Sequence, residues 1–367
     1  MIEMQFYPLT PLSLEEAKEF QFRFVRAIAD VFSGTDFFQM GDVGVPPAGS
    51  PVQTRKAEAV LAKFFNVEDC VLVRGAGTGA IRVSLAAYLE PGDTVIVHDA
   101  PMYTTTKETF RMLGLKTHKV NFHDDAALAD AVHAGKLLYI QHTRQQPEDR
   151  YELAHVIQVA RQSRPELPIV VDENYAVFKT RHIGVEVGAD VSTFSAFKLL
   201  GPEGIGVVVG RRACTARIRE RNYSGGGQVQ GPEAMEVLRA FTVAPVMIAV
   251  QSEQVTLLAE RLNAGAVPGI CEAHVANAQS RTVIARLEEP LAPQVIAACD
   301  AFGAATYPVG AESKYEVLPM IYRASGTVLE SQPELRPYLL RINPMRASAD
   351  LVVDILNRAL AKVRSEG

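Results

Sequence analysis

The stretch that decides the fold is Val191-Ser192-Thr193-Phe194-Ser195-Ala196-Phe197-Lys198, followed by Leu199-Leu200-Gly201-Pro202. Residues 191–197 are apolar apart from Ser192, Thr193 and Ser195, which is typical of a buried strand, and the segment ends in a lysine before a Gly-Pro turn. Lysine is rarely buried without a partner, so a lysine at this place is unusual. Loss of hydration lowers the pKa of an amine, and a neutral amine is the nucleophile that forms an imine. The alternative is a lysine whose ammonium group simply reaches the surface.

Apolar segments alternate with helical patterns on the N-terminal side of this stretch. The predicted strands are residues 70–73, 94–98, 115–120, 137–141, 168–172 and 191–195. Strands that alternate with helices predict a mostly parallel sheet covered on both faces, a three-layer α/β sandwich. Residues 205–210 follow the preceding strand too closely for a crossover helix, so they predict an antiparallel strand.

The length of 367 residues predicts more than one domain. We expect an N-terminal helical arm and loop over residues 1–50 and a large domain over 51–250. A smaller C-terminal α+β domain is expected over 251–367. Its expected strands are 275–288, 314–323 and 338–342, and its expected helices are 293–302 and 348–363.

Composition excludes several classes of partner. Apolar residues make up 48% of the chain, and the net charge of −5 gives no basic surface for nucleic acid. No apolar run approaches the about 20 residues that span a bilayer, and residues 1–9 lack the pattern of a secretory signal. The 4 cysteines have no metal-binding spacing. These features predict a cytoplasmic protein with no metal, nucleic-acid or membrane partner.

Ligands of open α/β sheets bind beyond the C-terminal ends of the strands. Gly75-Ala76-Gly77-Thr78-Gly79 joins a predicted strand to a helix, where backbone amides can hold an anion. Tyr103 follows the next strand and can stack on a planar ligand. Asp172 ends another strand and needs a positive or donor partner, such as a protonated pyridine nitrogen. Taken singly, these residues also fit a tight turn, a core tyrosine and a helix cap. Together with Lys198 they predict a cofactor site at one edge of the sheet.

These residues resemble the fold type I pyridoxal 5'-phosphate (PLP) enzymes, the aspartate aminotransferase superfamily. Asp172 followed by Ser195-Ala196-Phe197-Lys198 is similar to the signature in which Ser binds the cofactor phosphate and Lys forms the Schiff base. Gly201-Pro202-Glu203-Gly204-Ile205-Gly206 is similar to the segment after the lysine in class V aminotransferases. Tyr223-Ser224-Gly225-Gly226-Gly227-Gln228 resembles a class V segment that reaches the cofactor phosphate of a neighbouring subunit.

Two further resemblances concern the substrate and the subfamily. Leu340-Arg341-Ile342-Asn343-Pro344 is similar to the small-domain strand whose arginine binds the substrate carboxylate, and a guanidinium suits that task. The spacing from Gly77 to Tyr103 resembles that of the stacking tyrosine in cystathionine lyases. Residues 140–144 and 172–198 resemble cystathionine lyase-like proteins linked to aluminium resistance. The chain also resembles an enterobacterial group of aminotransferases of unassigned substrate.

The chain departs from the superfamily after the strand that ends at Gln141. Many members have an Asn-Pro pair there, whereas this chain has His142-Thr143-Arg144. His142 is therefore the candidate for the contact with the phenolic oxygen of the cofactor. Arg144 is a candidate for a second acidic group on the substrate, or it pairs with Glu148.

The resemblance implies an aminotransferase acting on an amino acid, in a homodimer with shared active sites. The alternative is a carbon-sulfur or carbon-oxygen lyase or replacement enzyme on a cysteine- or homoserine-type substrate. Both would use Lys198, Asp172 and Tyr103 as catalytic residues. The expected cofactor-binding residues are Gly75, Ala76, Gly77, Thr78, Gly79, Tyr103, His142, Asp172, Tyr175, Ser195, Lys198 and Gly227. The expected substrate-binding residues are Arg341, Arg144 and Tyr223.

Overall fold

The structure is a computed structural model, and it forms two compact units. It describes residues 5–44, 49–144, 146–277, 280–307, 312–324, 329 and 332–366. The larger unit comprises Glu15–Thr143 and Arg150–Val246. The smaller unit comprises the chain up to Leu14, Arg144–Asp149 and the chain from Met247 onwards. Within the described ranges, no helix has both the length and the apolar character needed to cross a membrane.

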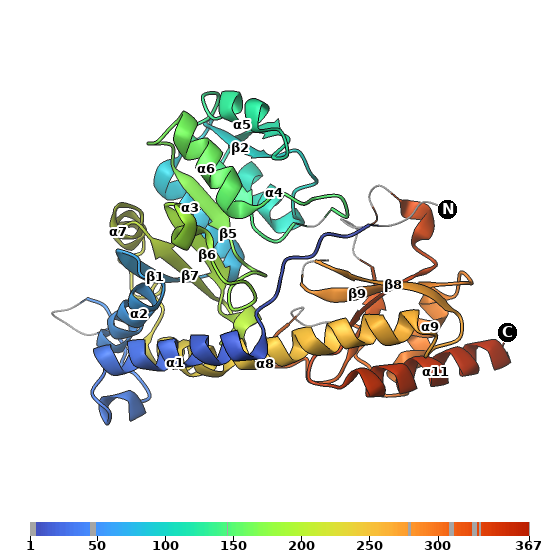
Figure 1. Ribbon diagram of the computed structural model, residues 1–367. Helices are drawn as coiled ribbons and strands as arrows, with labels where there is room; N and C mark the ends of the chain where they lie inside the picture. Colours follow the sequence, from blue (N-terminus) through green and yellow to red (C-terminus); the bar gives the residue numbers. More distant parts are fainter. Residues whose placement is uncertain are drawn as a thin grey trace. The chain divides into compact units, whose positions relative to one another are not determined.

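A seven-stranded sheet forms the centre of the larger unit, in the order β1-β7-β6-β5-β4-β2-β3 (Figure 1). Its strands are β1 (Asp69–Arg74), β2 (Thr94–His98), β3 (Lys116–Val120), β4 (Leu137–Gln141), β5 (Ile169–Asp172), β6 (Val191–Ser195) and β7 (Ile205–Gly210). Neighbouring strands are parallel except at β7, which runs antiparallel to β1 and β6. The predicted mostly parallel sheet and its antiparallel strand at 205–210 are confirmed.

Helices build an apolar core on each face of this sheet. Side chains alternate along a strand, so Tyr139 and Val170 enter one core while Ile140 and Val171 enter the other. The first core includes α3, α4 and α7, and the second includes α5 and α6. These helices are α3 (Ala76–Tyr88), α4 (Thr104–Met112), α5 (Asp125–Ala131), α6 (Leu153–Ser163) and α7 (Arg212–Arg221).

An aromatic cluster attaches three further helices to the larger unit. The ring of Phe24 lies 5.1 Å from that of Phe64 and 6.1 Å from that of Phe241. Phe241 in turn contacts Phe194 of β6. The helices are α1 (Leu14–Val31), α2 (Val52–Phe64) and α8 (Gly231–Asn263), and short 3-10 turns are η1 (Asp36–Phe38), η2 (Gly184–Val187) and η3 (Phe197–Leu199).

The smaller unit contains a four-stranded antiparallel sheet in the order β10-β11-β9-β8. Leu340 and Ile342 pack in one apolar core with the helices α9 and α11. Leu339 points to a second apolar cluster, which includes Phe6. Its elements are β8 (Ile270–Ala276), β9 (Thr282–Leu287), α9 (Ala292–Asp300), β10 (Met320–Arg323), η4 (Pro333–Leu335), β11 (Leu339–Asn343) and α11 (Ala349–Glu366).

Two strand predictions in this unit are wrong. The predicted strand 275–288 is the end of β8 and the whole of β9, and Asn277 leaves the ladder to accept a hydrogen bond from the N–H of Leu9 (3.3 Å). The predicted strand 314–323 is extended only in β10. Before β10, the Glu316 carboxylate accepts a hydrogen bond from the backbone N–H of Ser313 (2.7 Å). This bond closes a local turn where a strand was predicted.

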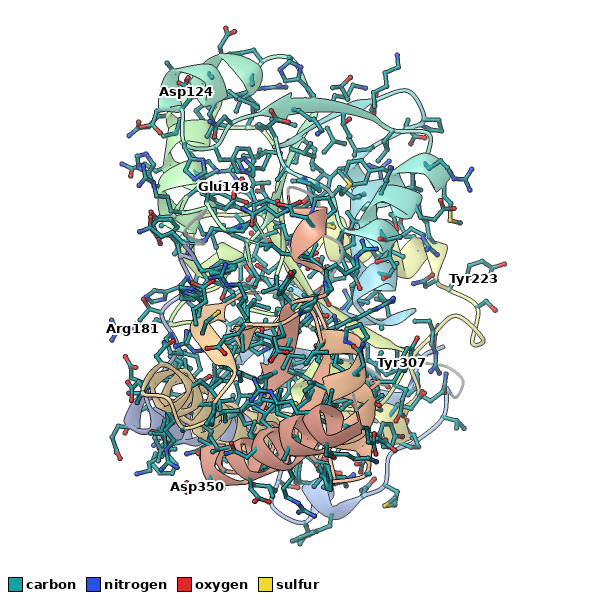
Figure 2. All side chains as sticks on the ribbon, turned by 90° about the vertical axis from the view of Figure 1, so that its right-hand side faces the viewer. Asp124, Glu148, Arg181, Tyr223, Tyr307 and Asp350 are labelled. Atoms are coloured by element: carbon teal, nitrogen blue, oxygen red, sulfur yellow. The ribbon has the colours of Figure 1, made fainter. Side chains whose placement is uncertain are left out.

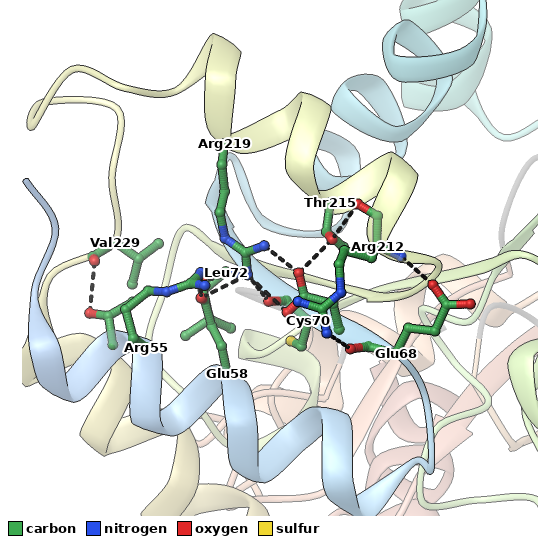
Figure 3. A network of polar contacts seen from close by, with 11 residues as sticks. Arg55, Glu58, Glu68, Cys70, Leu72, Arg212, Thr215, Arg219 and Val229 are labelled. Carbon is green, nitrogen blue, oxygen red and sulfur yellow. Dashed lines mark hydrogen bonds and ion pairs between the residues drawn. The ribbon is translucent and has the colours of Figure 1, made fainter.

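Strand β1 is an edge of the large sheet, and side chains satisfy its outer backbone groups (Figure 3). Glu58 accepts the N–H of Leu72 (2.9 Å), and Arg219 donates to the carbonyl of Cys70. Arg219 also binds the carboxylates of Glu58 (3.0 Å) and Asp69. Burial acts to raise the pKa of Asp69, but hydrogen bonds from Arg219 and Thr215 outweigh it and the pKa is lowered. A single guanidinium thus holds two carboxylates and a strand edge.

Replacing Arg219 should therefore destabilise the larger unit. Arg219→Met leaves the carboxylate of Asp69 without its cation and that of Glu58 with Arg55 alone, and we expect a loss of about 3 kcal/mol in the free energy of unfolding. Urea unfolding at neutral pH measures this loss. Lys18→Met, which removes an exposed ion pair with Glu15, is the control and should change stability by less than about 1 kcal/mol. Equal effects of the two variants would contradict the network's role.

Candidate active site

The register of the large sheet brings several of the predicted site residues to one set of strand ends. Asp172 lies opposite Gln141 of β4 and Thr193 of β6. Ser195 ends β6, and Lys198 follows it in η3. The structure therefore brings Asp172, Ser195 and Lys198 to the same edge of the sheet.

Several backbone N–H groups of the glycine-rich turn before α3 are already bonded to protein carbonyls. Gly75 has φ +95°, and the N–H groups of Gly75 and Ala76 donate to the carbonyl of Gly204 (2.8 and 3.0 Å). The N–H of Gly79 bonds the carbonyl of Gly75. Gly77 and Thr78 lie in the first turn of α3, whose N–H groups have no acceptor within the helix. The donors that this turn offers to an anion therefore come from Gly77 and Thr78.

The hydroxyl of Ser195 lies next to this turn. Ser195 pairs with Gly206 across β6 and β7, and a Cβ on Gly206 would lie 2.2 Å from the carbonyl oxygen of Ala76. Ser195 is 2% exposed, and its Oγ has no hydrogen-bond partner within the described part of the chain. Burying a hydroxyl without a hydrogen-bond partner costs free energy, which indicates that a bound ligand supplies the missing partner.

The carboxylate of Asp172 is buried and held by three donors. Tyr139 donates its hydroxyl to Oδ2 (3.0 Å), while the backbone N–H and side-chain amide of Asn174 donate to Oδ1 (3.0 and 2.7 Å). Burial nevertheless raises the pKa of Asp172, against these hydrogen bonds and the charge of Lys198. Burial and the charge of Asp172 also raise the pKa of Tyr139, so its hydroxyl stays a donor. A cationic ligand group beside Asp172 would lower this pKa again.

Lys198 lies over an aromatic ring. Its Nζ is 3.5 Å from the ring centre of Tyr175, which is itself buried. The amine and the Asp172 carboxylate are close enough to interact electrostatically. Lys198 is partly buried rather than fully exposed, so the predicted loss of hydration is present in part.

Two other predicted residues lie beside these strand ends. Tyr103 immediately precedes α4, and α4 approaches α3 through a hydrogen bond between the hydroxyls of Thr105 and Thr78 (3.2 Å). His142 follows β4, where its N–H donates to the carbonyl of Asp172 (3.1 Å). Nδ1 of His142 lies 2.6 Å from the carboxylate of Glu173.

The remaining predicted residues lie elsewhere. Gly227 and Tyr223 line a cavity of about 330 Å³ near the β1 edge, which also involves Arg55 of α2. Tyr223 is 81% exposed and projects from the surface (Figure 2). The lining of this cavity does not include the strand-end residues described above.

The two predicted substrate arginines belong to the smaller unit. Arg341 of β11 is 1% exposed, and its guanidinium carbon lies 5.0 Å from the ring centre of Tyr322 on β10. Arg144 is also buried, and it donates to the carbonyl of Tyr7 (2.8 Å).

Sequence reasoning missed three residues around Asp172. Tyr139, Glu173 and Asn174 support the strand ends, and a Cβ on Gly77 would lie 1.9 Å from the amide oxygen of Asn174. A signal existed for Tyr139, a lone hydroxyl in an otherwise apolar strand, and for Glu173, a second acidic residue directly after a buried strand.

Removing the Ser195 hydroxyl tests whether it is kept for a ligand. Without ligand, Ser195→Ala should leave the free energy of unfolding unchanged or raise it by up to about 1 kcal/mol, because it removes an unsatisfied buried group. The same variant should reduce the stabilisation that added PLP produces. Thermal unfolding with and without PLP measures both effects.

The matched control is Ser192→Ala on the same strand. The Ser192 hydroxyl accepts the N–H of Val185 (3.1 Å) and donates to Glu173 (3.4 Å), so its loss should cost about 1 to 2 kcal/mol. If both variants destabilise the ligand-free protein equally, Ser195 is an ordinary structural serine.

Comparison with known proteins places this site in a family. The class-V aminotransferase profile matches residues 50–250, and a profile described as the YhfS-like C-terminal domain matches residues 256–356. YhfS of Escherichia coli strain K12 is 45% identical over 363 residues, which cover 98% of this chain and 100% of YhfS. The crystal structure of E. coli YhfS, described as a PLP-dependent protein, has a TM-score of 0.95 over 98% of this chain and 100% of that one.

More distant structures share the fold. CalE6, a methionine gamma lyase from Micromonospora echinospora, is 17% identical with a TM-score of 0.71, over 93% of this chain and 98% of that one. Cystathionine gamma synthase from Xanthomonas oryzae is 19% identical with a TM-score of 0.69, over 94% and 98%. The predicted resemblance to fold type I enzymes is confirmed, and the chain belongs to the class-V aminotransferase family as a homologue of YhfS.

Proposed function

We propose that this chain is a PLP-dependent enzyme that transfers the amino group of an amino acid. The observation that carries the proposal is the combination of Asp172, Ser195 and Lys198 at one set of strand ends. A buried carboxylate, a buried hydroxyl that has no hydrogen-bond partner among the described residues and an amine are the groups that a pyridine nitrogen, a phosphate and an aldehyde require. PLP-dependence of the close relative YhfS supports the same cofactor here.

The residues present fit this cofactor. The amides of Gly77 and Thr78 and the hydroxyl of Ser195 would hold the phosphate, at the N-terminus of α3 where the helix dipole favours an anion. Asp172 would bind the ring nitrogen and keep it protonated. Tyr103 would pack beside the ring. Bound in this way, PLP supplies an electron-withdrawing ring that weakens the bonds at the substrate Cα.

Lys198 has two tasks in this proposal. Its amine is the group that would hold the cofactor aldehyde. When it is not bound to the cofactor, the same amine would act as a base that removes the proton from the substrate Cα and later returns a proton. Tyr175 keeps this amine at the strand ends through the contact between Nζ and its ring.

Arg341 is the proposed partner of the substrate carboxylate. Its guanidinium is buried on β11 and stacked near Tyr322, which limits the conformations it can adopt. A planar guanidinium can bind a carboxylate through two parallel hydrogen bonds, which makes it the appropriate group for an amino acid. Arg144 is the second candidate for binding an acidic group of the substrate.

A second candidate function is elimination or replacement on a cysteine- or homoserine-type substrate. The observation that favours it is Tyr103, which the structure places at the start of α4, beside α3. A tyrosine there could also assist the departure of a leaving group.

A substrate screen distinguishes the two reactions. For transamination, an amino acid should convert the visible absorbance of the lysine-bound cofactor to that of pyridoxamine phosphate, and a keto acid should reverse the change. Lys198→Ala, the control, should show neither change, because it lacks both the imine-forming amine and the base. Release of ammonia and a keto acid without an acceptor would instead support elimination. A protein that acquires no such absorbance when PLP is added would contradict both.

We also propose a homodimer in which the segment 223–228 reaches the neighbouring site. Phe38, Met40, Val43 and Tyr223 are 82%, 70%, 61% and 81% exposed, and exposed apolar side chains of this size are suited to a contact between subunits. Hydrogen bonds join their loops, from the N–H of Gly231 to the carbonyl of Asp42 (2.8 Å) and from the side-chain amide of Gln228 to the carbonyl of Gly49 (3.1 Å).

Charge placed in this surface should separate the subunits. Phe38→Glu should shift the protein from dimer to monomer in light scattering and reduce PLP affinity, because the phosphate loses the neighbour's contacts. Tyr307→Glu, at a tyrosine 83% exposed in the smaller unit, is the control and should remain dimeric. A wild-type monomer with a full complement of PLP would contradict the proposed dimer.

A further inference from the structure

The two oxygens of the Asp172 carboxylate do not receive the same number of hydrogen bonds. Oδ1 accepts two from Asn174, one from its backbone N–H (3.0 Å) and one from its side-chain amide (2.7 Å). Oδ2 accepts one, from the hydroxyl of Tyr139 (3.0 Å), and the described residues offer it no second donor. Each carboxylate oxygen has about two lone pairs that can accept. Oδ1 is therefore saturated, whereas Oδ2 has one lone pair left for a ligand.

Packing fixes the tyrosine that donates to Oδ2. Tyr139 is 4% exposed in the core that α3 and α4 form on the sheet, and its ring lies edge-on, 5.7 Å from that of Phe110 on α4. The register between β4 and β5 puts its side chain on the same face of the sheet as that of Asp172. The raised pKa of Tyr139 keeps its hydroxyl protonated, so this group remains a donor to the carboxylate.

The carboxylate lies on the side of the sheet that α3 covers. Asn174, which holds Oδ1, lies against the first turn of α3, since a Cβ on Gly77 would be 1.9 Å from the amide oxygen of Asn174. The charge of Lys198 acts to lower the pKa of Asp172, so the amine is also near this carboxylate. A ligand that binds both the α3 turn and Lys198 can therefore form a hydrogen bond with Asp172 only at Oδ2.

We propose that Tyr139 is a positioning residue: its hydroxyl holds Oδ2 of Asp172, and the protonated ring nitrogen of PLP binds the remaining lone pair of that same oxygen. The identity of the ligand rests on the proposed function, whereas the difference between the two oxygens is a property of the chain alone. Tyr139 does not touch the cofactor and acts only through Asp172. Because a donor to a carboxylate favours its ionised form, Tyr139 also helps to keep the shared proton on the ring nitrogen.

Tyr139→Phe tests this role, because it removes the hydroxyl and keeps the aromatic ring in the core. Asp172 then loses a hydrogen bond that lowers its pKa, so the proton should move from the ring nitrogen towards the carboxylate. Nitrogen NMR of protein loaded with PLP that is isotope-labelled at the ring nitrogen measures this shift. We expect the signal of a protonated pyridine in the wild type and a signal displaced towards the neutral ring in Tyr139→Phe. PLP binding should also weaken about tenfold, the effect of losing one hydrogen bond to a charged group.

Tyr151→Phe is the matched control for a purely structural effect. Tyr151 is 7% exposed, and its hydroxyl donates to the carbonyl of Gln141 at the end of β4 (2.6 Å) rather than to Asp172. This variant also removes a buried tyrosine hydroxyl at the same strand, but it should leave the ring-nitrogen signal unchanged. Equal displacement in both variants, or none in a folded Tyr139→Phe, would overturn the positioning role.

A crystal structure of the wild-type protein with PLP tests the choice of oxygen without any variant. We expect the ring nitrogen within about 3 Å of Oδ2, the oxygen that Tyr139 contacts. A ring nitrogen bonded to Oδ1, or to a different residue, would overturn the inference although PLP binds as the proposed function requires. A wild type that does not bind PLP would instead contradict the proposed function, and the inference would fail with it.

Discussion

The set of hydrogen bonds that holds the carboxylate of Asp172 at the end of β5 is the constraint on which the site depends. Tyr139 and Asn174 fix both oxygens, and burial raises the pKa of the acid, so the site favours a partner that brings a positive charge. Asn174 in turn lies against Gly77, where a Cβ would clash. The electrostatics of the ring-nitrogen position and the shape of the α3 turn are thus determined by the same few contacts.

The backbone donors of the turn before α3 fall into two groups, which suits the proposed phosphate site. Gly75 and Ala76 give their N–H groups to the carbonyl of Gly204, which fastens the turn to the loop after Lys198. The first turn of α3 then points its two remaining amides outwards, and Ser195 adds a hydroxyl from β6. Rigidity comes from the engaged donors, and binding is left to those without an internal acceptor.

Much of this fold could be predicted because the β strands are short, apolar and separated by turn residues. Residues 94–98, 137–141, 191–195 and 205–210 are strands with the predicted limits. The failures arose where side chains rather than hydrophobic pattern decide the backbone, as at Glu316, whose carboxylate closes a turn. In the site, residue type singled out Asp172 and Lys198, but the approach of the Tyr139 hydroxyl to Asp172 depends on the packing of neighbouring strands, which no local pattern records.

Chemical trapping of the bound cofactor is the decisive test of whether Lys198 is the residue that carries PLP. Borohydride reduction of the purified protein loaded with PLP, followed by peptide mass spectrometry, locates the amine that carries the cofactor. This account predicts a single pyridoxyl adduct, on the peptide that contains Lys198. An adduct on another lysine, or none, would contradict it, and the strand-end residues would then require a different ligand.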